Sequence, residues 1–295
     1  MSVAEMPASV ATRRRAGSWG DGIGRGLWVL ARWIIVGGSY LFLLSPLIVV
    51  MGASFHDAHA YVGVTFPPEG FTLRWFGEIT EKQYESMALS VVLALAAALG
   101  ACILGVPAAL GVVRGNLPGK GLLLAVFRAP MQIPSIVIGV AFLNMYYIFG
   151  DITGLYVNGS LLGLYLGHLF VATPYVIGSV VAVLQRFNGR LEEAALSLGA
   201  GPVRTLWRVT LPVLLPGIYA GGLYAFMVSF SDVPVSMFLS STGMVTYPVE
   251  LFFGIENDFS PAVLASSTLV ILFSLAMLLL AQRLVGLDAM LRSNR

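Results

Sequence analysis

Long runs without a charged residue are the feature that most constrains the fold of this 295-residue chain. A membrane-spanning helix needs about 20 mostly apolar residues, and six uncharged runs reach that length. With 57% hydrophobic and only 11% charged residues, the chain also has too little charge to cover the surface of a soluble domain. The sequence therefore predicts an all-α integral membrane protein with six transmembrane helices, at residues 33–55, 87–113, 129–150, 161–184, 210–232 and 260–282.

The ends of the chain are expected to be short tails. We expect a mobile N-terminal tail over residues 1–26, a membrane domain over residues 27–287 and a C-terminal tail over residues 288–295. Arg13–Arg15 precede an apolar run, as in a signal peptide. The run at Trp33–Ser54 is longer than the apolar part of such a peptide, so we predict a retained first span.

The basic residues indicate the orientation. All but two of the 17 lie in the two tails or in the second and fourth loops, whereas Arg74 and Lys82 lie on the other side. Because Lys and Arg concentrate in cytoplasmic loops, we expect both termini in the cytoplasm and the protein in the inner (cytoplasmic) membrane. A seventh span at Val233–Val249 would place the C-terminal arginines outside. Prolines and polar residues interrupt that run, so we expect a loop or re-entrant segment there.

Catalytic and metal-binding patterns are weak. The segment Gly115–Gly121 has glycines and a lysine without the spacing of a phosphate loop, which favours a turn between two spans. His56 and His59 lie near Asp57, but no fourth ligand accompanies them, so we expect no metal site and no catalytic residues. His168 stands alone in the fourth span, where a hydrogen bond between packed helices is the simplest role.

The fourth loop is the most informative segment. Apolar residues recur at helical spacing from Arg190 to Leu198 and predict a short helix with one apolar face. The run Gly199-Ala-Gly-Pro202 ends it, and a second short helix is expected over Val203–Val209. This elbow, residues 189–209, suits docking into another protein's groove or, alternatively, lying on lipid headgroups.

The same loop resembles a family motif. Glu193-Ala194-Ala195, then Gly199 and finally Leu211-Pro212 match the EAA loop of binding-protein-dependent ABC importer permeases, whose pattern is EAA-x3-G-x9-I-x-LP. The one departure is Val209 in place of Ile. The resemblance implies a MetI-like permease fold and a coupling contact with a cytoplasmic ATPase, formed by Glu193, Ala194, Ala195, Gly199, Leu211 and Pro212.

The resemblance also implies the partners. The chain would be a transporter subunit and not an enzyme, paired with a second homologous permease subunit in a heterodimer. A soluble binding protein would deliver the solute. Two ATPase subunits would bind ATP and Mg²⁺, so we expect no cofactor in this chain. We also expect no nucleic-acid partner. Two other classes stay open: an intramembrane enzyme, which would need facing nucleophile and base residues, and a channel or receptor without an ATPase.

The end of the fifth span bears on the substrate. Ser229-Phe230-Ser231-Asp232 and the later Tyr247-Pro248 resemble the second permease subunit of spermidine/putrescine systems, with Ser231 where that family usually has a second acid. The resemblance implies a polyamine or related cationic amine. Ferric iron, thiamine, sulfate, phosphonate or an amino-acid derivative remain alternatives within the same family.

Asp232 is the one carboxylate expected at membrane depth. A charge there usually faces a bundle interior or a watery cavity, so Asp232 is a candidate for the transport path of a cation. Alternatively, it caps a helix or pairs with a basic residue of a partner subunit. Helix packing or interfacial anchoring is likewise the alternative for the other candidates, which are Ser229, Ser231, Tyr224, Tyr175 and Asn144.

Overall fold

Helices make up nearly all the regular structure in the part of the chain that the computed structural model describes, residues 19–57, 63–257 and 259–293. Six helical segments there are long and apolar enough to cross a membrane, which confirms the predicted number of spans. They are Gly26–Ala53, Glu81–Arg114, Ser135–Thr153, Leu161–Leu184, Pro202–Phe230 and Pro261–Leu279. The chain divides into two bodies, residues 1–49 and 50–295, which are described separately.

The first body contains most of α1 (Trp19–Ala53). This helix begins at Trp19, so residues 19–26 of the predicted tail are helical, while residues 1–18 lie outside the described residues. Its sequence is apolar over several turns on all sides, as expected of a helix whose solvent is lipid. Pro46 lies inside the helix, which is tolerated in membrane helices.

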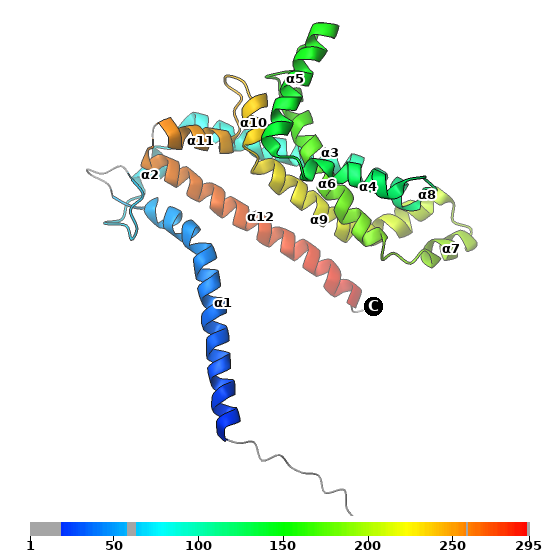
Figure 1. Cartoon of the computed structure of the whole chain (residues 1–295), viewed down its shortest axis with the longest axis horizontal. Helices are drawn as coiled ribbons and strands as arrows, with labels where there is room; N and C mark the ends of the chain where they lie inside the picture. The colour runs from blue at the N-terminus through cyan, green and yellow to red at the C-terminus, as the bar shows by residue number, and fades with distance from the viewer. Residues whose placement is uncertain (1–18, 58–62, 258, 294–295) are drawn as a thin grey trace, which may run out of the picture. The chain divides into compact units, whose positions relative to one another are not determined.

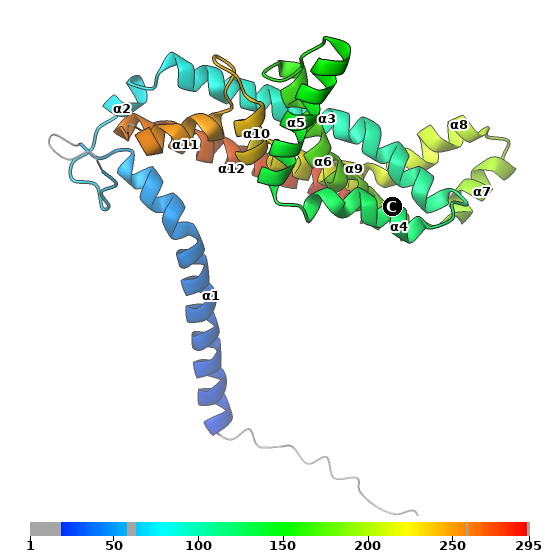
Figure 2. The ribbon, with the colours of Figure 1, turned by 45° about the horizontal axis from the view of Figure 1, so that its top comes forward.

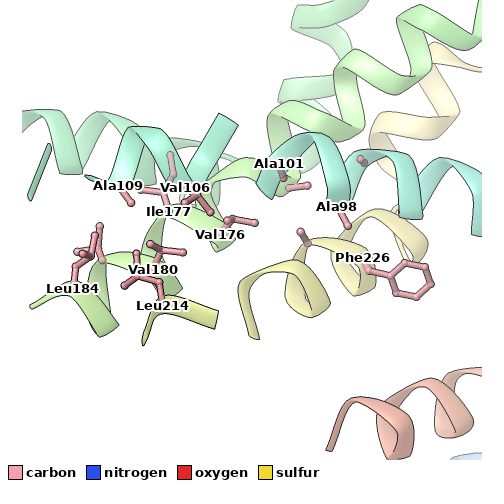
Figure 3. Close-up of a cluster of buried hydrophobic side chains, with 14 of the residues drawn as sticks. Ala98, Ala101, Val106, Ala109, Val176, Ile177, Val180, Leu184, Leu214 and Phe226 are labelled. Atoms are coloured by element: carbon pink, nitrogen blue, oxygen red, sulfur yellow. The ribbon is translucent and has the colours of Figure 1, made fainter. Parts of the chain in front are cut away.

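The second body is built around three helices, α3 (Glu81–Arg114), α6 (Leu161–Leu184) and α9 (Leu211–Phe230), which make the most extensive helix contacts in the described chain. Figure 1 shows the three running side by side. Their buried side chains form one cluster, which includes Ala98 and Ala101 of α3, Val176 and Ile177 of α6 and Phe226 of α9 (Figure 3). Alanine and glycine recur along this face of α3, and their small side chains let the helices approach closely.

The α6–α9 contact brings the backbones of two helices close together. A Cβ atom placed on Gly221 of α9 would lie 2.8 Å from the Cα atom of Val176 of α6, and one on Gly217 would lie 3.1 Å from the carbonyl oxygen of Ser179. Both obstacles are backbone atoms, which cannot rotate away. Only glycine therefore permits this spacing of the two helices.

The third span begins later than predicted. The chain first forms α4 (Lys120–Arg128) and a 3₁₀ turn, η1 (Ala129–Met131), before the spanning helix α5 (Ser135–Thr153). Proline has no backbone N–H to continue a helix, and Pro130 lies in η1 while Pro134 directly precedes α5. The predicted span of residues 129–150 was wrong at its start. Pro174, in contrast, lies inside α6.

The two ends of the second body differ. The short helix α2 (Arg74–Gly77) and α11 (Tyr247–Asn257) lie at one end, and the elbow helices α7 (Arg190–Ser197) and α8 (Pro202–Thr205) lie at the opposite end in both views (Figures 1 and 2). The run at Val233–Val249 contains the six-residue helix α10 (Pro234–Leu239) and a bridge between Ser241 and Met244. It is therefore not a seventh span.

The last helix, α12 (Pro261–Ser293), extends past the predicted sixth span and covers most of residues 288–295, which we expected as a tail. Its residues 261–266 are buried, and its Phe273 and Met277 pack against the α3–α6–α9 cluster. The sixth span is thereby joined to the core.

Replacing Gly221 tests the close approach of α6 and α9. We expect Gly221→Ala to lower the free energy of unfolding by about 1–3 kcal/mol, because overpacking forces the helices apart. The measurement is thermal unfolding of the detergent-solubilised protein. Gly111→Ala in α3 is the matched control, since a Cβ atom there meets nothing within 4 Å. Equal effects of the two substitutions would contradict the packing argument.

Candidate functional site

The elbow turns at Gly199. Helix α7 ends with the amide of Gly199 donating to the carbonyl of Leu196 at 2.9 Å and the amide of Ala200 donating to that of Ala195 at 3.0 Å. These are the two hydrogen bonds of a Schellman motif, which needs a left-handed residue just past the helix. Gly199 supplies it with a φ of 84°. The glycine of the predicted motif is therefore required by the backbone of the turn.

The second arm of the elbow runs directly into the fifth span. Gly201 and Pro202 open α8, a π-helical turn η2 (Leu206–Thr210) follows, and α9 begins at Leu211. The predicted second helix at Val203–Val209 is thus continuous with the span. Leu211 packs against the buried cluster of α3, α6 and α9, so the end of the motif is anchored in the core.

The outer face of the elbow is apolar and open. Leu198 is 89% exposed, and Val203 and Trp207 are also exposed. Glu193 and Ala194 lie on the accessible surface and Ala195 is half-buried. Apolar side chains held out on a bent helical pair form a surface suited to a groove of another protein.

A second candidate site lies where α9 ends. Asp232, Ser231 and Tyr175 line a cavity of about 230 Å³ whose other walls are mainly apolar. A neighbouring cavity of about 480 Å³ shares Tyr175 and is also lined by Tyr224 and Arg128. Four of the predicted path residues are therefore brought together: Asp232, Ser231, Tyr175 and Tyr224.

Asp232 also holds a helix start. Its Oδ2 atom accepts a hydrogen bond from the backbone amide of Ser236 at 2.9 Å, in the first turn of α10, and the backbone of Val235 donates to the same carboxylate. The hydroxyl of Ser236 is a further donor at 3.3 Å. The two predicted roles are thus compatible, because one carboxylate both lines the cavity and caps α10.

Comparison with known proteins assigns the family. Residues 101–286, more than half of the chain, match the family described as the binding-protein-dependent transport system inner membrane component. The chain belongs to this family.

Among curated proteins, the permease is 28% identical to the putrescine transport system permease protein PotI of Escherichia coli K12 over 79% of its own length and 83% of PotI. It is 30% identical to the spermidine/putrescine transport system permease protein PotC of Haemophilus influenzae, over 82% of this chain and 91% of PotC. It is also 30% identical to the molybdenum transport system permease protein ModB of Mycobacterium bovis, over 69% and 81% of the two chains.

Solved structures show the same fold. A permease chain from a bacterial ABC transporter that imports alginate matches with a TM-score of 0.68 at 16% identity, over 91% of this chain and 97% of that one. A chain of the MetNI methionine transporter matches with a TM-score of 0.56 at 16% identity, over 72% and 98%. The expected MetI-like permease fold is confirmed, and the protein is an ABC importer permease. Such permeases work with a substrate-binding protein and ATPase subunits.

Ser229 lies apart from the cavities of this permease. Its hydroxyl is buried and lies 2.8 Å from Nδ1 of His168, while Nε2 of His168 lies 2.9 Å from the hydroxyl of Ser236. One ring nitrogen of a neutral histidine donates and the other accepts, so both serines find a partner. The helix-packing hydrogen bond predicted for His168 is confirmed, and it joins α6 to α9 and α10.

The remaining sequence candidates have local partners. Asn144 donates to the carbonyl of Val140 at 2.9 Å and lines neither cavity. Nδ1 of His56 accepts from the amide of Glu69 at 2.9 Å, while His59 lies outside the described residues. No group of three metal-ligating side chains occurs in the described part of the chain. Gly115–Gly119 form the expected turn, and Lys120, the first residue of α4, donates from Nζ to the carbonyl of Val113.

Sequence reasoning missed Ser236. It links the Asp232 carboxylate to His168, and its only sequence signal is its place four residues after Asp232, at the start of a short helix behind a proline. That spacing allows a helical amide to donate to the carboxylate. It does not show that His168, on another helix, contacts the Ser236 hydroxyl.

Two substitutions distinguish the effect of the hydrogen-bond acceptor of Asp232 on stability from the effect of its negative charge. We expect Asp232→Asn to leave the free energy of unfolding nearly unchanged, because the amide oxygen can still accept from Ser236. Asp232→Ala should lower it by about 1 kcal/mol through loss of the cap. Thermal unfolding of the two purified variants measures the difference. If Asn destabilises as much as Ala, the negative charge and not the acceptor holds α10.

Proposed function

We propose that this permease imports a polyamine, such as putrescine or spermidine, driven by cytoplasmic ATPase subunits that dock on the elbow. The observation that carries the ATPase contact is the exposed turn at Leu198 and Gly199, which presents the EAA residues on a bent, apolar surface. Similarity to PotI and PotC supports the polyamine. The Asp232 carboxylate in the cavity supports a cationic solute.

The arrangement in the membrane follows from the charges. We infer that both termini and the elbow face the cytoplasm, because nearly all Lys and Arg lie in the tails, the second loop and the elbow loop. The end with α2 and α11 then faces outward and receives the binding protein. A second, homologous permease subunit completes the path as a heterodimer. The ATPase subunits bind ATP and Mg²⁺, and this chain binds no cofactor.

The cavity chemistry favours a cation. An amine entering next to Asp232 gains a charge-assisted hydrogen bond, which compensates for part of its lost hydration. Tyr175 and Tyr224 add aromatic faces that attract cations, while Arg128, which repels them, lies in the larger cavity and not in the one that Asp232 lines. A transported oxyanion is the competing class, because ModB is also a relative, and Asp232 would repel it.

The transport role of Asp232 has its own test. We expect Asp232→Asn to raise about tenfold the amine concentration that gives half-maximal uptake, because a charged hydrogen bond becomes a neutral one. The measurement is uptake of labelled putrescine and spermidine into vesicles carrying the full transporter. Asp151→Asn is the matched control, since that carboxylate accepts a bond from Tyr156 and lines neither cavity. Unchanged amine uptake in Asp232→Asn, or molybdate uptake by the wild type, would argue against the proposed path or substrate.

ATPase docking on the elbow can be tested separately. We expect Leu198→Glu to reduce co-purification of the ATPase subunits with the permease, because a buried charge in an apolar contact is costly. Leu155→Glu is the control, with another exposed leucine, 65% exposed against 89% for Leu198, in the loop between α5 and α6. The elbow is not the docking surface if both variants retain the ATPase as well as the wild type does.

A further inference from the structure

Three segments far apart in the sequence meet at Glu192, in the first turn of α7. An Nη2 atom of Arg114, the last residue of α3, lies 2.6 Å from Oε1 of Glu192. The hydroxyl of Thr210, at the junction of η2 and α9, donates to the same oxygen. The Arg114 guanidinium also lies over the ring of Phe187, 5.4 Å from its centroid. One carboxylate therefore contacts the ends of two membrane helices.

The neighbouring Glu193 has different surroundings. Its side chain is exposed, and it forms no ion pair within residues 19–57, 63–257 and 259–293. The Glu192 side chain is only 20% exposed. Because adjacent helical residues point in directions about 100° apart, α7 can present Glu193 outward while Glu192 faces the membrane helices. Glu192 is thus held by the membrane helices, whereas the Glu193 side chain is exposed on the elbow.

The hydrogen bond between Thr210 and Glu192 links α7 to α9 across an irregular turn of the backbone. Between α8 and α9 the chain passes through the π-helical turn at Leu206–Thr210, and such turns interrupt the regular helical hydrogen bonding. If only the backbone transmitted a displacement of the elbow to α9, that displacement would have to pass through this irregular turn. Glu192 accepts its hydrogen bond from the hydroxyl of Thr210 at the far end of the turn, where Thr210 is 1% exposed and fixed by packing.

We propose that Glu192 is a positioning residue that ties α7 to Arg114 of α3 and Thr210 of α9, so that displacement of the elbow moves both helices together. This inference rests on the proposed docking of ATPase subunits on the elbow. Helices α3 and α9 both pack on α6, so the tie connects the docking surface to the core of the second body. Partly exposed ion pairs of this kind contribute little to stability, so variants are expected to fold.

The first test follows motion and needs no substrate. Hydrogen exchange is measured on the complete complex, permease pair with ATPase subunits, with and without a non-hydrolysable ATP analogue. In the wild type we expect nucleotide to change amide exchange in α7 and, together with it, at the Arg114 end of α3 and the Thr210 end of α9. In Glu192→Ala, which removes both contacts, we expect the change to remain in α7 alone, and in Arg114→Gln we expect it to be lost at α3 but kept at α9.

Matched controls separate the tie from local effects. Arg186→Gln removes an exposed arginine of the same loop that makes no described ion pair. Thr205→Val removes a buried hydroxyl that bonds only within the elbow, to the carbonyl of Gly201, whereas Thr210→Val removes the bond to Glu192. Both controls should transmit the nucleotide effect like the wild type, and Thr210→Val should lose it at α9.

The second test measures how tightly transport is coupled to ATP hydrolysis. We expect the amount of putrescine imported per ATP hydrolysed to fall at least about fivefold in Glu192→Ala and Arg114→Glu, a size typical of coupling between sites. The double variant Arg114→Glu with Glu192→Arg restores an opposite-charge pair and should recover much of the ratio. A purely structural defect would not be rescued by exchanging the charges.

The outcomes distinguish the two proposals. If Glu192→Ala transmits the nucleotide effect to α3 and α9 and keeps the wild-type ratio, the tie is wrong while the proposed function stands. If the wild type imports no amine, the substrate is wrong and hydrogen exchange still decides the tie. If the wild type does not retain ATPase subunits, both the docking proposal and the tie that depends on it are overturned.

Discussion

The close packing of α3, α6 and α9 is the constraint on which the rest of the second body depends. In lipid, helices gain little from burying apolar side chains against one another, so van der Waals fit and polar contacts decide which helices associate. Here the fit comes from small residues, most sharply at Gly221, where a Cβ atom would meet the backbone of α6. The elbow and the cavities are both built on helices whose spacing this contact sets.

Buried polar side chains then give the packed helices a specific arrangement. His168 joins α6 to Ser229 of α9 and Ser236 of α10. Tyr247 of α11 donates a hydrogen bond from its backbone amide to the Ser90 hydroxyl of α3 and another from its hydroxyl to the Ser266 hydroxyl of α12. Each partner would be costly to leave unpaired in an apolar interior. If one helix shifted along another, several of these hydrogen bonds would break at once. The energetic cost of such a shift is therefore higher than apolar contacts alone would impose.

The sequence was sufficient for those features that depend on solvent or local backbone. Six spans follow from the uncharged runs, and the turn at Gly199 follows from a helix that ends in a glycine. The start of the third span was missed because hydropathy does not register that Pro130 and Pro134 interrupt helical hydrogen bonding over residues 129–134. The contacts of Glu192 and Asp232 depend on which helices meet, and no spacing in a single sequence encodes the approach of Arg114 to Glu192.

The two candidate sites are connected by one helix. Helix α9 begins at Leu211, next to the residue that contacts Glu192, and ends at Phe230, just before Ser231 and Asp232 in the cavity. Its 20 residues give a rod about 30 Å long, comparable to the apolar thickness of a bilayer. A rod packed along its length against α6 transmits a displacement at one end as a rotation or shift at the other. Elbow movement therefore has a direct mechanical route to the Asp232 carboxylate, and the bond from Asp232 to Ser236 extends that route to α10 and His168.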